Sequence, residues 1–509
     1  MTLSDAVAGA VAALRRRPAD ILPFYLLGAA IPAIVRVLPF LGIAVAVVYL
    51  ELSGRLDAAL ADLEPGALEP PDSEADPAAF DAWAEEVVPL AEQLFPLEVQ
   101  LLAAAVALGS IVLAVVLYGA VSAGQLSACY GRLRDDRGLA VGLAGAERFW
   151  LRFVGLYLLE IGAWIAVGAI GIAGAALIGG ALAAATGTGA AAALVALPAL
   201  LAAAVAFAAI RAVFAFAPAA VVVDDAGVVG SLSATVGFLR RHPIAAGFYY
   251  VLAVGSTVAL SALTSVFVVL EVPSIGALLT ALVALPFLDL LKVGLYGGPT
   301  GRLSPPSAPE RSFRRRVADG LRRGWAELGS FVRATPLLHA FVVAAAVGTF
   351  WAGWELADPL VGTTETSIAA RLEGHVPPTA AVEFFGNNWT VAYTTAFGGL
   401  ALAVPAFVAL AFNGLVMGVT ARLEVELAEL AAFVLPHGLL EVPAILVAGA
   451  LGLWLGAIGW RGLRGRASRR EVVDALERAF WVVVGLGIVL AVAGFVEGFV
   501  SPYYYEPFL

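Results

Sequence analysis

Apolar runs of about 20 residues recur along this 509-residue chain, and they constrain its fold more than any other feature. A run of that length with few charges is what an α-helix needs to cross the hydrocarbon core of a bilayer. The chain is 61% hydrophobic and only 14% charged, whereas an ordinary soluble protein has about 25% charged residues. We therefore expect an all-α, polytopic transmembrane protein with about 11 helical spans in two bundles.

The first half of the chain, residues 1–298, is predicted to be a six-span membrane domain. Three arginines at 15–17 precede the first apolar run and place the N-terminus in the cytoplasm, because basic segments are retained there. Residues 51–98 hold 13 acids and one arginine, so they should form an external acidic loop with a helix at the membrane interface. The spans are expected near residues 21–50, 99–124, 152–182, 191–216, 245–270 and 274–297.

Residues 299–325 are predicted to be a basic cytoplasmic linker that leads into an amphipathic helix. Between residues 301 and 323 there are seven arginines and two acids, and the helical periodicity should lay this helix along the inner membrane surface. The arginines expected to face lipid headgroups are Arg311, Arg314, Arg315, Arg316, Arg322 and Arg323.

The remaining residues, 326–509, are predicted to form a five-span membrane domain. The chain must cross an odd number of times between the outside loop at 357–382 and the arginine-rich inside loop at 461–470. The spans are therefore expected near residues 336–356, 386–409, 413–435, 439–460 and 478–500, which leaves the C-terminus outside. The whole chain is expected to be a multi-pass protein of the plasma membrane.

The few charged residues are unusual in kind. Lys292 is the only lysine, and acids exceed basic residues by 40 to 30. With abundant Ala, Val and Gly, this halophile-like composition suggests a salt-adapted prokaryote, in which acidity reflects solubility in brine rather than a basic partner. The expected partners are membrane lipids and either other membrane proteins or further copies of this chain in a homo-oligomer. No nucleic acid and no cofactor are expected.

The most informative polar stretch is FVLPHGLLEVPAILVAGALG, residues 433–452. Because His437 and Glu441 are four residues apart, they share a helix face, and ionisable groups at membrane depth usually face a bundle interior or a wet cavity. The pair could bind a cation or relay a proton. It could instead lock helix packing, or satisfy backbone groups freed where Pro436 and Gly438 break the helix. The candidate polar site comprises Asn388, Asn413, His437, Glu441 and Glu497.

Several classes of enzyme are disfavoured. A zinc hydrolase needs at least three protein ligands, and by the predicted topology His339 and His375 do not readily join His437. No GxSxG sequence and no Walker-type phosphate loop is present, and Cys129 has no evident base nearby. We therefore assign no catalytic residue and no metal ligand, and expect a protein without enzymatic activity.

Two charged pairs fall within the predicted spans of the first half. Asp289 and Lys292 are three residues apart on one helix face and could form an ion pair, with Lys292 extending towards the inner interface. Glu160 and Arg211 lie in neighbouring spans and could also pair. The small-residue stretches GAIGIAGAALIGGALAAATGTGAAAAL and AGALGLWLGAIG are interpreted as close helix contacts, with a transport path as the alternative.

The second half resembles the stage II sporulation protein M family. The residues that carry this resemblance, between about Arg311 and Pro502, are Asn387-Asn388, Asn413-Gly414, LPHGLLEVPAI at 435–445, Ala448-Gly449 and EGFVSP at 497–502. The resemblance implies a membrane domain of about five helices. The namesake of the family helps to assemble a cell-wall-remodelling complex with partner hydrolases during sporulation, but it lacks the preceding membrane domain found here.

The first half resembles the six-span membrane domains that precede some glycerophosphodiester phosphodiesterases. This resemblance lies in FAPAAVVVD at 216–224, Gly227 and the helix at 231–243. No soluble phosphodiesterase domain follows in this sequence, so hydrolytic activity is not implied.

Two functional hypotheses follow from these observations. In the first, the protein is a non-enzymatic scaffold or partner-recruiting component in envelope organisation. In the second, it is a transporter or lipid-handling protein with a polar intramembrane site around His437 and Glu441. The two hypotheses differ in whether the five polar residues converge on a cavity or lie sealed between helices.

Overall fold

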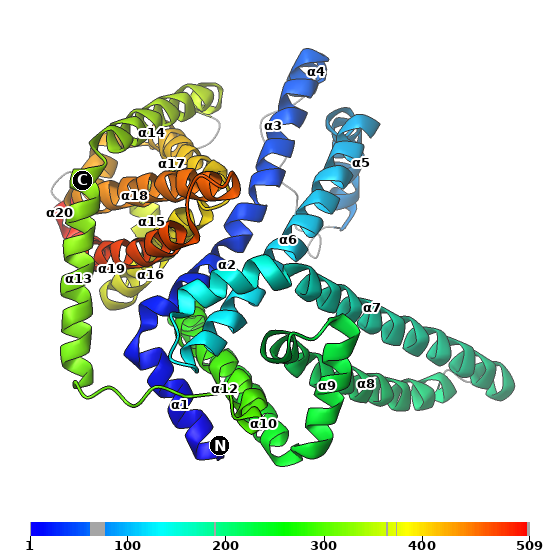
Figure 1. Cartoon of the computed structure of the whole chain (residues 1–509). Helices are drawn as coiled ribbons and strands as arrows, with labels where there is room; N and C mark the ends of the chain where they lie inside the picture. The colour runs from blue at the N-terminus through cyan, green and yellow to red at the C-terminus, as the bar shows by residue number, and fades with distance from the viewer. Residues whose placement is uncertain (1, 62–76, 188–189, 363–364, 373, 506–509) are drawn as a thin grey trace.

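The computed structural model describes residues 2–61, 77–187, 190–362, 365–372 and 374–505. The described residues are 88% helical and contain no strand, and they include ten segments long and apolar enough to cross a membrane (Figure 1). The prediction of an all-α, polytopic protein is therefore confirmed.

Six of the ten candidate spans lie in the first half, where six were predicted. Its α-helices are α1 (Leu3–Arg16), α2 (Leu22–Val35), α3 (Val37–Leu52), α4 (Arg55–Ala61), α5 (Pro77–Leu94), α6 (Leu97–Arg132), α7 (Gly138–Thr186), α8 (Ala190–Asp224), α9 (Val228–Arg241), α10 (Pro243–Val269), α11 (Pro273–Leu279) and α12 (Leu285–Gly297). Short turns η1 (Pro18–Asp20), η2 (Thr280–Ala284) and η3 (Gly298–Thr300) connect some of them, and η2 is a single π-helical turn.

Two features of the first half go beyond the predicted spans. The helix expected at the interface lies within α5, and residues 62–76 of the predicted acidic loop are outside the described residues.

Helix α7 has 49 residues, which at 1.5 Å per residue makes it about 70 Å long, against a hydrocarbon core of about 30 Å. Part of α7 must therefore lie outside the core or cross it at a steep tilt. Figure 1 shows α7 and α8 projecting together away from the second half.

The second half contains the other four candidate spans. Its helices are α13 (Phe313–Ala334), α14 (Pro336–Leu356), α15 (Ile368–Leu372), α16 (Pro377–Gly398), α17 (Val404–Leu423), α18 (Leu427–Leu463), α19 (Arg469–Phe499) and α20 (Ser501–Tyr505), with the turn η4 (Asp358–Leu360) after α14. Helix α16 is too polar to count as a candidate span, yet it runs antiparallel to α19. A Cβ added at Gly498 would lie 2.7 Å from Ala381 Cβ, and Trp389 Nε1 donates to the Val483 carbonyl at 3.0 Å. Helix α16 thus corresponds to the span predicted near 386–409, but it begins earlier.

Prolines set the turns at which one helix gives way to the next. His242, Val272 and Thr335 each precede a proline that begins α10, α11 or α14. Their φ angles are −129°, −127° and −129°, and their ψ angles are 52°, 48° and 48°. A residue before proline is kept out of the α region, so the preceding segment ends there and the next helix starts at an angle.

The two small-residue stretches differ in how they pack. In α18, a Cβ at Gly452 would lie 2.6 Å from the Thr395 carbonyl oxygen, and one at Gly456 would lie 2.3 Å from the Ala403 nitrogen. Close helix contact is therefore correct for α18. It is wrong for three positions of the α7 stretch, where an added Cβ would meet nothing within 4 Å: Gly168, Gly174 and Gly180.

Helix α2 links the two halves. Its residues Phe24, Leu26 and Ala30 belong to the same buried cluster as Phe397 of α16 and Leu486 of α19. A second buried cluster joins α1, α6, α7, α8, α9, α10 and α12 of the first half. The division into domains 1–298 and 326–509 stays a prediction, and the structure adds that these two segments share one core through α2.

Candidate functional site

Three helices of the second half bring most of the predicted polar residues together. His437 and Glu441 lie on α18, Glu497 lies near the end of α19, and Asn388 lies on α16. One ligand atom from each of His437, Glu441 and Glu497 lies within 4.8 Å of the other two. We call these three residues the polar triad.

The polar triad is largely hidden from the surface. The side chains of His437 and Glu497 are 8% and 12% exposed, and His437 Nε2 lies 3.9 Å from Glu497 Oε1. The Glu441 carboxyl is in hydrogen-bonding contact with Glu497 and Asn388. Among the described residues, the Oε2 atoms of Glu441 and Glu497 have no partner. Two adjacent, largely buried carboxylates are too costly to remain charged and uncompensated, so we infer that the pair holds a proton or a cation.

Sequence reasoning missed Ser501 as a partner of the triad. Its hydroxyl oxygen lies 2.9 Å from His437 Nδ1, and Ser501 is fully buried at the start of α20. The ring of Phe433, one turn before His437, packs edge-on against the imidazole at 5.3 Å. The available signal was the motif EGFVSP, which places a small hydroxyl four residues after Glu497 at the end of a span.

Asn413 does not reach the polar triad. It lies on α17, and its Nδ2 donates to the carbonyl oxygen of Ala409 in the same helix at 2.8 Å. This contact satisfies a polar side chain at membrane depth within its own helix. The structure therefore gathers four of the five predicted polar residues and leaves Asn413 apart.

The helix break expected at Pro436 and Gly438 is wrong. Helix α18 is continuous from Leu427 to Leu463, with Pro436 and Pro443 inside it. A proline removes one backbone donor, but membrane helices tolerate this where neighbouring helices and side chains hold the backbone in place. The predicted spans near 413–435 and 439–460 correspond to α17 and α18, whose connection lies earlier, at residues 424–426.

The polar triad could hold a metal ion, although the sequence assigned none. It offers one nitrogen and two oxygen ligands, so a four-coordinate ion would need at least one more ligand, such as water. His375 lies near the polar triad, because its Nε2 is 2.9 Å from the carbonyl oxygen of Gly498, the residue after Glu497. Its ring nitrogens are not among the clustered ligand atoms. Because two of these three ligands are carboxylates, the triad suits a hard or borderline divalent cation better than a soft metal ion, which prefers thiolate ligands.

A second polar set lines a cavity of about 710 Å³ between helices of the first half. Lys292 Nζ donates to Asp289 Oδ1 at 2.9 Å, and the Tyr25 hydroxyl donates to Asp289 Oδ2 at 2.8 Å. Arg211 of α8 pairs with Glu160 of α7 at 2.7 Å. The Lys292 side chain is only 12% exposed, so it is held at this cavity rather than extended towards the interface. The cavity wall thus carries two positive and two negative side chains, each paired.

The arginines predicted to face lipid headgroups have different surroundings. Helix α13 crosses α19 so closely that a Cβ at Gly324 would lie 2.9 Å from the Gly485 nitrogen. Arg323 donates to Glu477 at 2.9 Å. Arg311 and Arg322 lie 3.2 and 3.5 Å from Asp319, Arg314 and Arg315 are exposed, and Arg316 is half-buried.

Helix α13 also keeps an apolar edge that is largely exposed in the described part of the chain. Val317, Leu321 and Trp325 are 42%, 44% and 58% exposed along this edge. The amphipathic helix expected from sequence is thus present, with one apolar side on α19 and another open. Its contact with the inner membrane surface stays a prediction.

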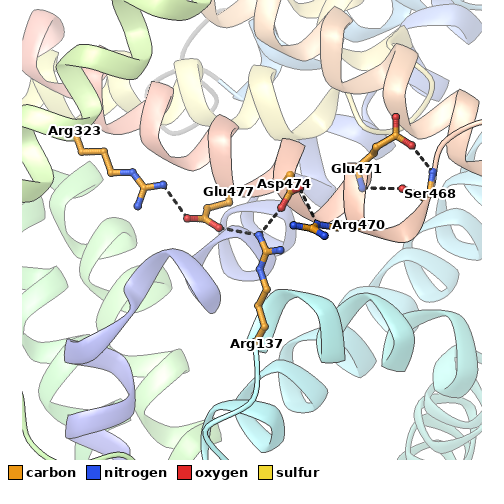
Figure 2. A network of polar contacts seen from close by, with 7 residues as sticks. All are labelled: Arg137, Arg323, Ser468, Arg470, Glu471, Asp474 and Glu477. Atoms are coloured by element: carbon orange, nitrogen blue, oxygen red, sulfur yellow. Dashed lines mark hydrogen bonds and ion pairs between the residues drawn. The ribbon is translucent and has the colours of Figure 1, made fainter.

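Charged contacts join the first half, α13 and α19 at the arginine-rich end of the molecule, which we call the basic face. Figure 2 shows the Arg137 guanidinium, just before α7, between two carboxylates of α19. Its Nη2 lies 2.6 Å from Asp474 Oδ1 and 2.9 Å from Glu477 Oε2, and Arg323 reaches the other oxygen of Glu477 (Figure 2). A capping box between Ser468 and Glu471 begins α19 beside this network.

Comparison with known proteins gives one match. Residues 337–502 match the family model described as Stage II sporulation protein M, and this segment contains the whole polar triad, Asn388 and Ser501. No match to a curated protein or to a solved structure was found. The resemblance of the first half to the membrane domains of phosphodiesterase fusions is not shown by these comparisons. Together with the ten candidate spans, the match supports a multi-pass membrane protein whose C-terminal part is similar to stage II sporulation protein M.

Proposed function

We propose that this chain is a non-enzymatic scaffold of the plasma membrane, in which the sporulation-M-type domain holds a second membrane domain in a fixed position. The observation that carries the proposal is the packing of α2, from the first half, against α16 and α19. Close packing of apolar helices is how membrane helices associate, since lipid is as apolar as their side chains. A domain that holds one helix in this way is suited to recruiting others.

Polar contacts between the halves support the same proposal. At one end of the spans, the backbone nitrogen and hydroxyl of Ser274 donate to Glu383 Oε2 at 3.2 and 2.5 Å. At the basic face, Arg137 binds α19, and Arg469 pairs with Glu147 of α7 at 2.5 Å. The halves are therefore joined at both ends as well as through α2.

The alternative, a transporter or lipid-handling protein, rests on one specific observation. The unpartnered carboxylate oxygens of Glu441 and Glu497 could bind a transported cation or proton. Against it, the cavity around Lys292 is lined by no residue of the polar triad, and Asn413 lies apart from the triad. A triad held between helices favours a structural role.

The orientation and partners belong to the same proposal. Arginine-rich segments from both halves meet at the basic face, where Arg137 pairs with Asp474 and Arg469 pairs with Glu147. Since basic loops are retained inside, we place the basic face and the N-terminus in the cytoplasm and the C-terminus outside. The partners we propose are membrane lipids and other membrane proteins or a second copy of the chain.

Charge reversal at Arg137 tests the junction between the halves. Arg137→Glu places a third carboxylate beside Asp474 and Glu477, and should weaken the association of the halves after the linker is cut. The two pairs are partly exposed, so each contributes about 0.2–1 kcal/mol, and we expect a total loss of roughly twofold to thirtyfold in affinity.

A matched control and a rescue complete this experiment. Arg134→Glu changes the same charge three residues earlier, where Arg134 contacts only nearby Asp136 among the described ion pairs. Reversing Asp474 to arginine should partly restore the association of the Arg137→Glu variant, and it leaves Glu477 in contact with Arg323. Equal weakening by Arg134→Glu, or no rescue, would show that the network does not hold the halves together.

A further inference from the structure

A cavity of about 800 Å³ opens on the basic face where the first half, the linker and the second half meet. Its walls are the end of α1 with η1, the linker at 307–311, one side of α13 and the first part of α19. A volume of this size is typical of a site for a small molecule rather than for a single ion. The cavity is separate from the polar triad and from the cavity around Lys292.

Most charged side chains in the wall already have partners of opposite charge. Arg137 and Arg323 both bind Glu477, as Figure 2 shows. Arg311 lies 3.2 Å from Asp319. These ion pairs hold the paired side chains in place, so the paired side chains are not free to bind a charged ligand.

Three arginines of the wall have no carboxylate partner within the described residues: Arg16, Arg17 and Arg316. Arg16 reaches only the Ser307 hydroxyl, at 3.4 Å. Nη1 of Arg316 is buried and has no hydrogen-bond partner in the described part of the chain. Burial, together with the charge of Arg15, lowers the pKa of Arg316, as expected for a guanidinium without a counter-ion.

The acids in the wall do not cancel this positive charge. Of the wall carboxylates in the described residues, Glu310 alone has no arginine partner. Burial raises the pKa of Asp20 even though Arg132 lies nearby, which weakens its contribution as an anion. Three unpaired guanidinium groups thus stand against one unpaired carboxylate.

We propose that this cavity binds a phosphate-bearing anion, with Arg16, Arg17 and Arg316 as its ligands. The guanidinium fork matches the geometry of phosphate oxygens, and basic pockets between membrane helices on the cytoplasmic side bind phospholipid headgroups. The phosphate could belong to a lipid headgroup or to a free phosphorylated compound, because both present the same group. Since α1 belongs to the first half and α13 to the second, the bound anion ties the two halves together.

The test uses the purified full-length protein in detergent at 150 mM salt, with two probes. One probe is dihexanoyl phosphatidic acid and the other is inorganic pyrophosphate, and binding is measured by titration calorimetry. Arg316→Gln removes a proposed ligand, and Arg314→Gln removes the same charge from an exposed position two residues away, outside the cavity. Loss of one charge-assisted contact should weaken binding about tenfold to a hundredfold for Arg316→Gln, and less than about twofold for Arg314→Gln.

The binding results distinguish a lipid headgroup from a free phosphate compound, and they also show whether the cavity binds a phosphate-bearing anion at all. Saturable binding of phosphatidic acid alone supports a lipid headgroup, and similar binding of pyrophosphate supports a free phosphate compound. Melting curves without probe confirm that both variants fold. Absence of saturable binding to either probe, or equal weakening by the two variants, overturns the proposal, since general attraction to basic helix α13 would then account for the result.

Discussion

Replacing His437 with alanine is expected to lower the free energy of unfolding by roughly 2–4 kcal/mol. The change removes a buried ring that packs against Phe433 and leaves the buried hydroxyl of Ser501 without the imidazole. The loss combines an unfilled space with a broken hydrogen bond, so it should exceed that of a surface substitution severalfold. Equilibrium unfolding of the full chain in mixed detergent measures it.

Two further variants show whether the loss comes from this contact. Ser501→Ala should cost about 1 kcal/mol, and the double variant with His437→Ala should cost less than the sum of the two. Ser265→Ala is the matched control, because the hydroxyl of this exposed serine donates to the Ser261 carbonyl of its own helix. If His437→Ala and Glu441→Gln keep full stability yet abolish cation or substrate transport, the polar triad is a transport site and the structural role is wrong.

Replacing Gly353 with leucine is expected to have a still larger effect. Helices α14 and α17 approach so closely that a Cβ at Gly353 would lie 2.0 Å from the Leu415 carbonyl oxygen, and one at Gly418 would lie 2.0 Å from the Phe350 carbonyl oxygen. The obstacle is backbone, which cannot rotate away as a side chain can, so the two helices must separate. We expect a loss at or above about 3 kcal/mol and little monodisperse protein after purification.

Gly348→Leu is the control for that prediction. Gly348 lies on the same helix, and a Cβ there would meet nothing within 4 Å. This variant should purify and melt like the unchanged protein, by size-exclusion chromatography and thermal unfolding. Similar behaviour of the two variants would mean that α14 and α17 are not in close contact in the membrane.

The sequence predicted the spans well because hydropathy measures the transfer of each segment into lipid. It could not predict which helices touch. Helix α2 is apolar on all sides, so nothing in its pattern indicates that Phe24 and Ala30 join the core of the second half. Likewise, the glycines of α7 and α18 look alike in sequence, and only their neighbours in space separate open positions from close contacts.

The candidate site was predicted only in part, again because the sequence does not show which helices touch. The spacing of His437 and Glu441 places both on one helix face whichever residues they meet. That Glu497 joins them, that Asn413 does not, and that Ser501 completes the set depend on how α16 to α20 are arranged. The helix break predicted at Pro436 was wrong, because a proline that breaks a helix in water is tolerated where neighbouring helices hold the backbone in place.

The most direct test of the scaffold proposal is to cut the linker and ask whether the halves stay together. A protease site inserted after Glu310, in the irregular segment before α13, leaves the full chain to fold first and be cleaved afterwards. We predict that the two fragments co-elute as one complex on size-exclusion chromatography in mild detergent, because α2 and the basic-face network hold them. Separate elution of two monodisperse fragments would contradict the claim that the sporulation-M-type domain holds the first half in place.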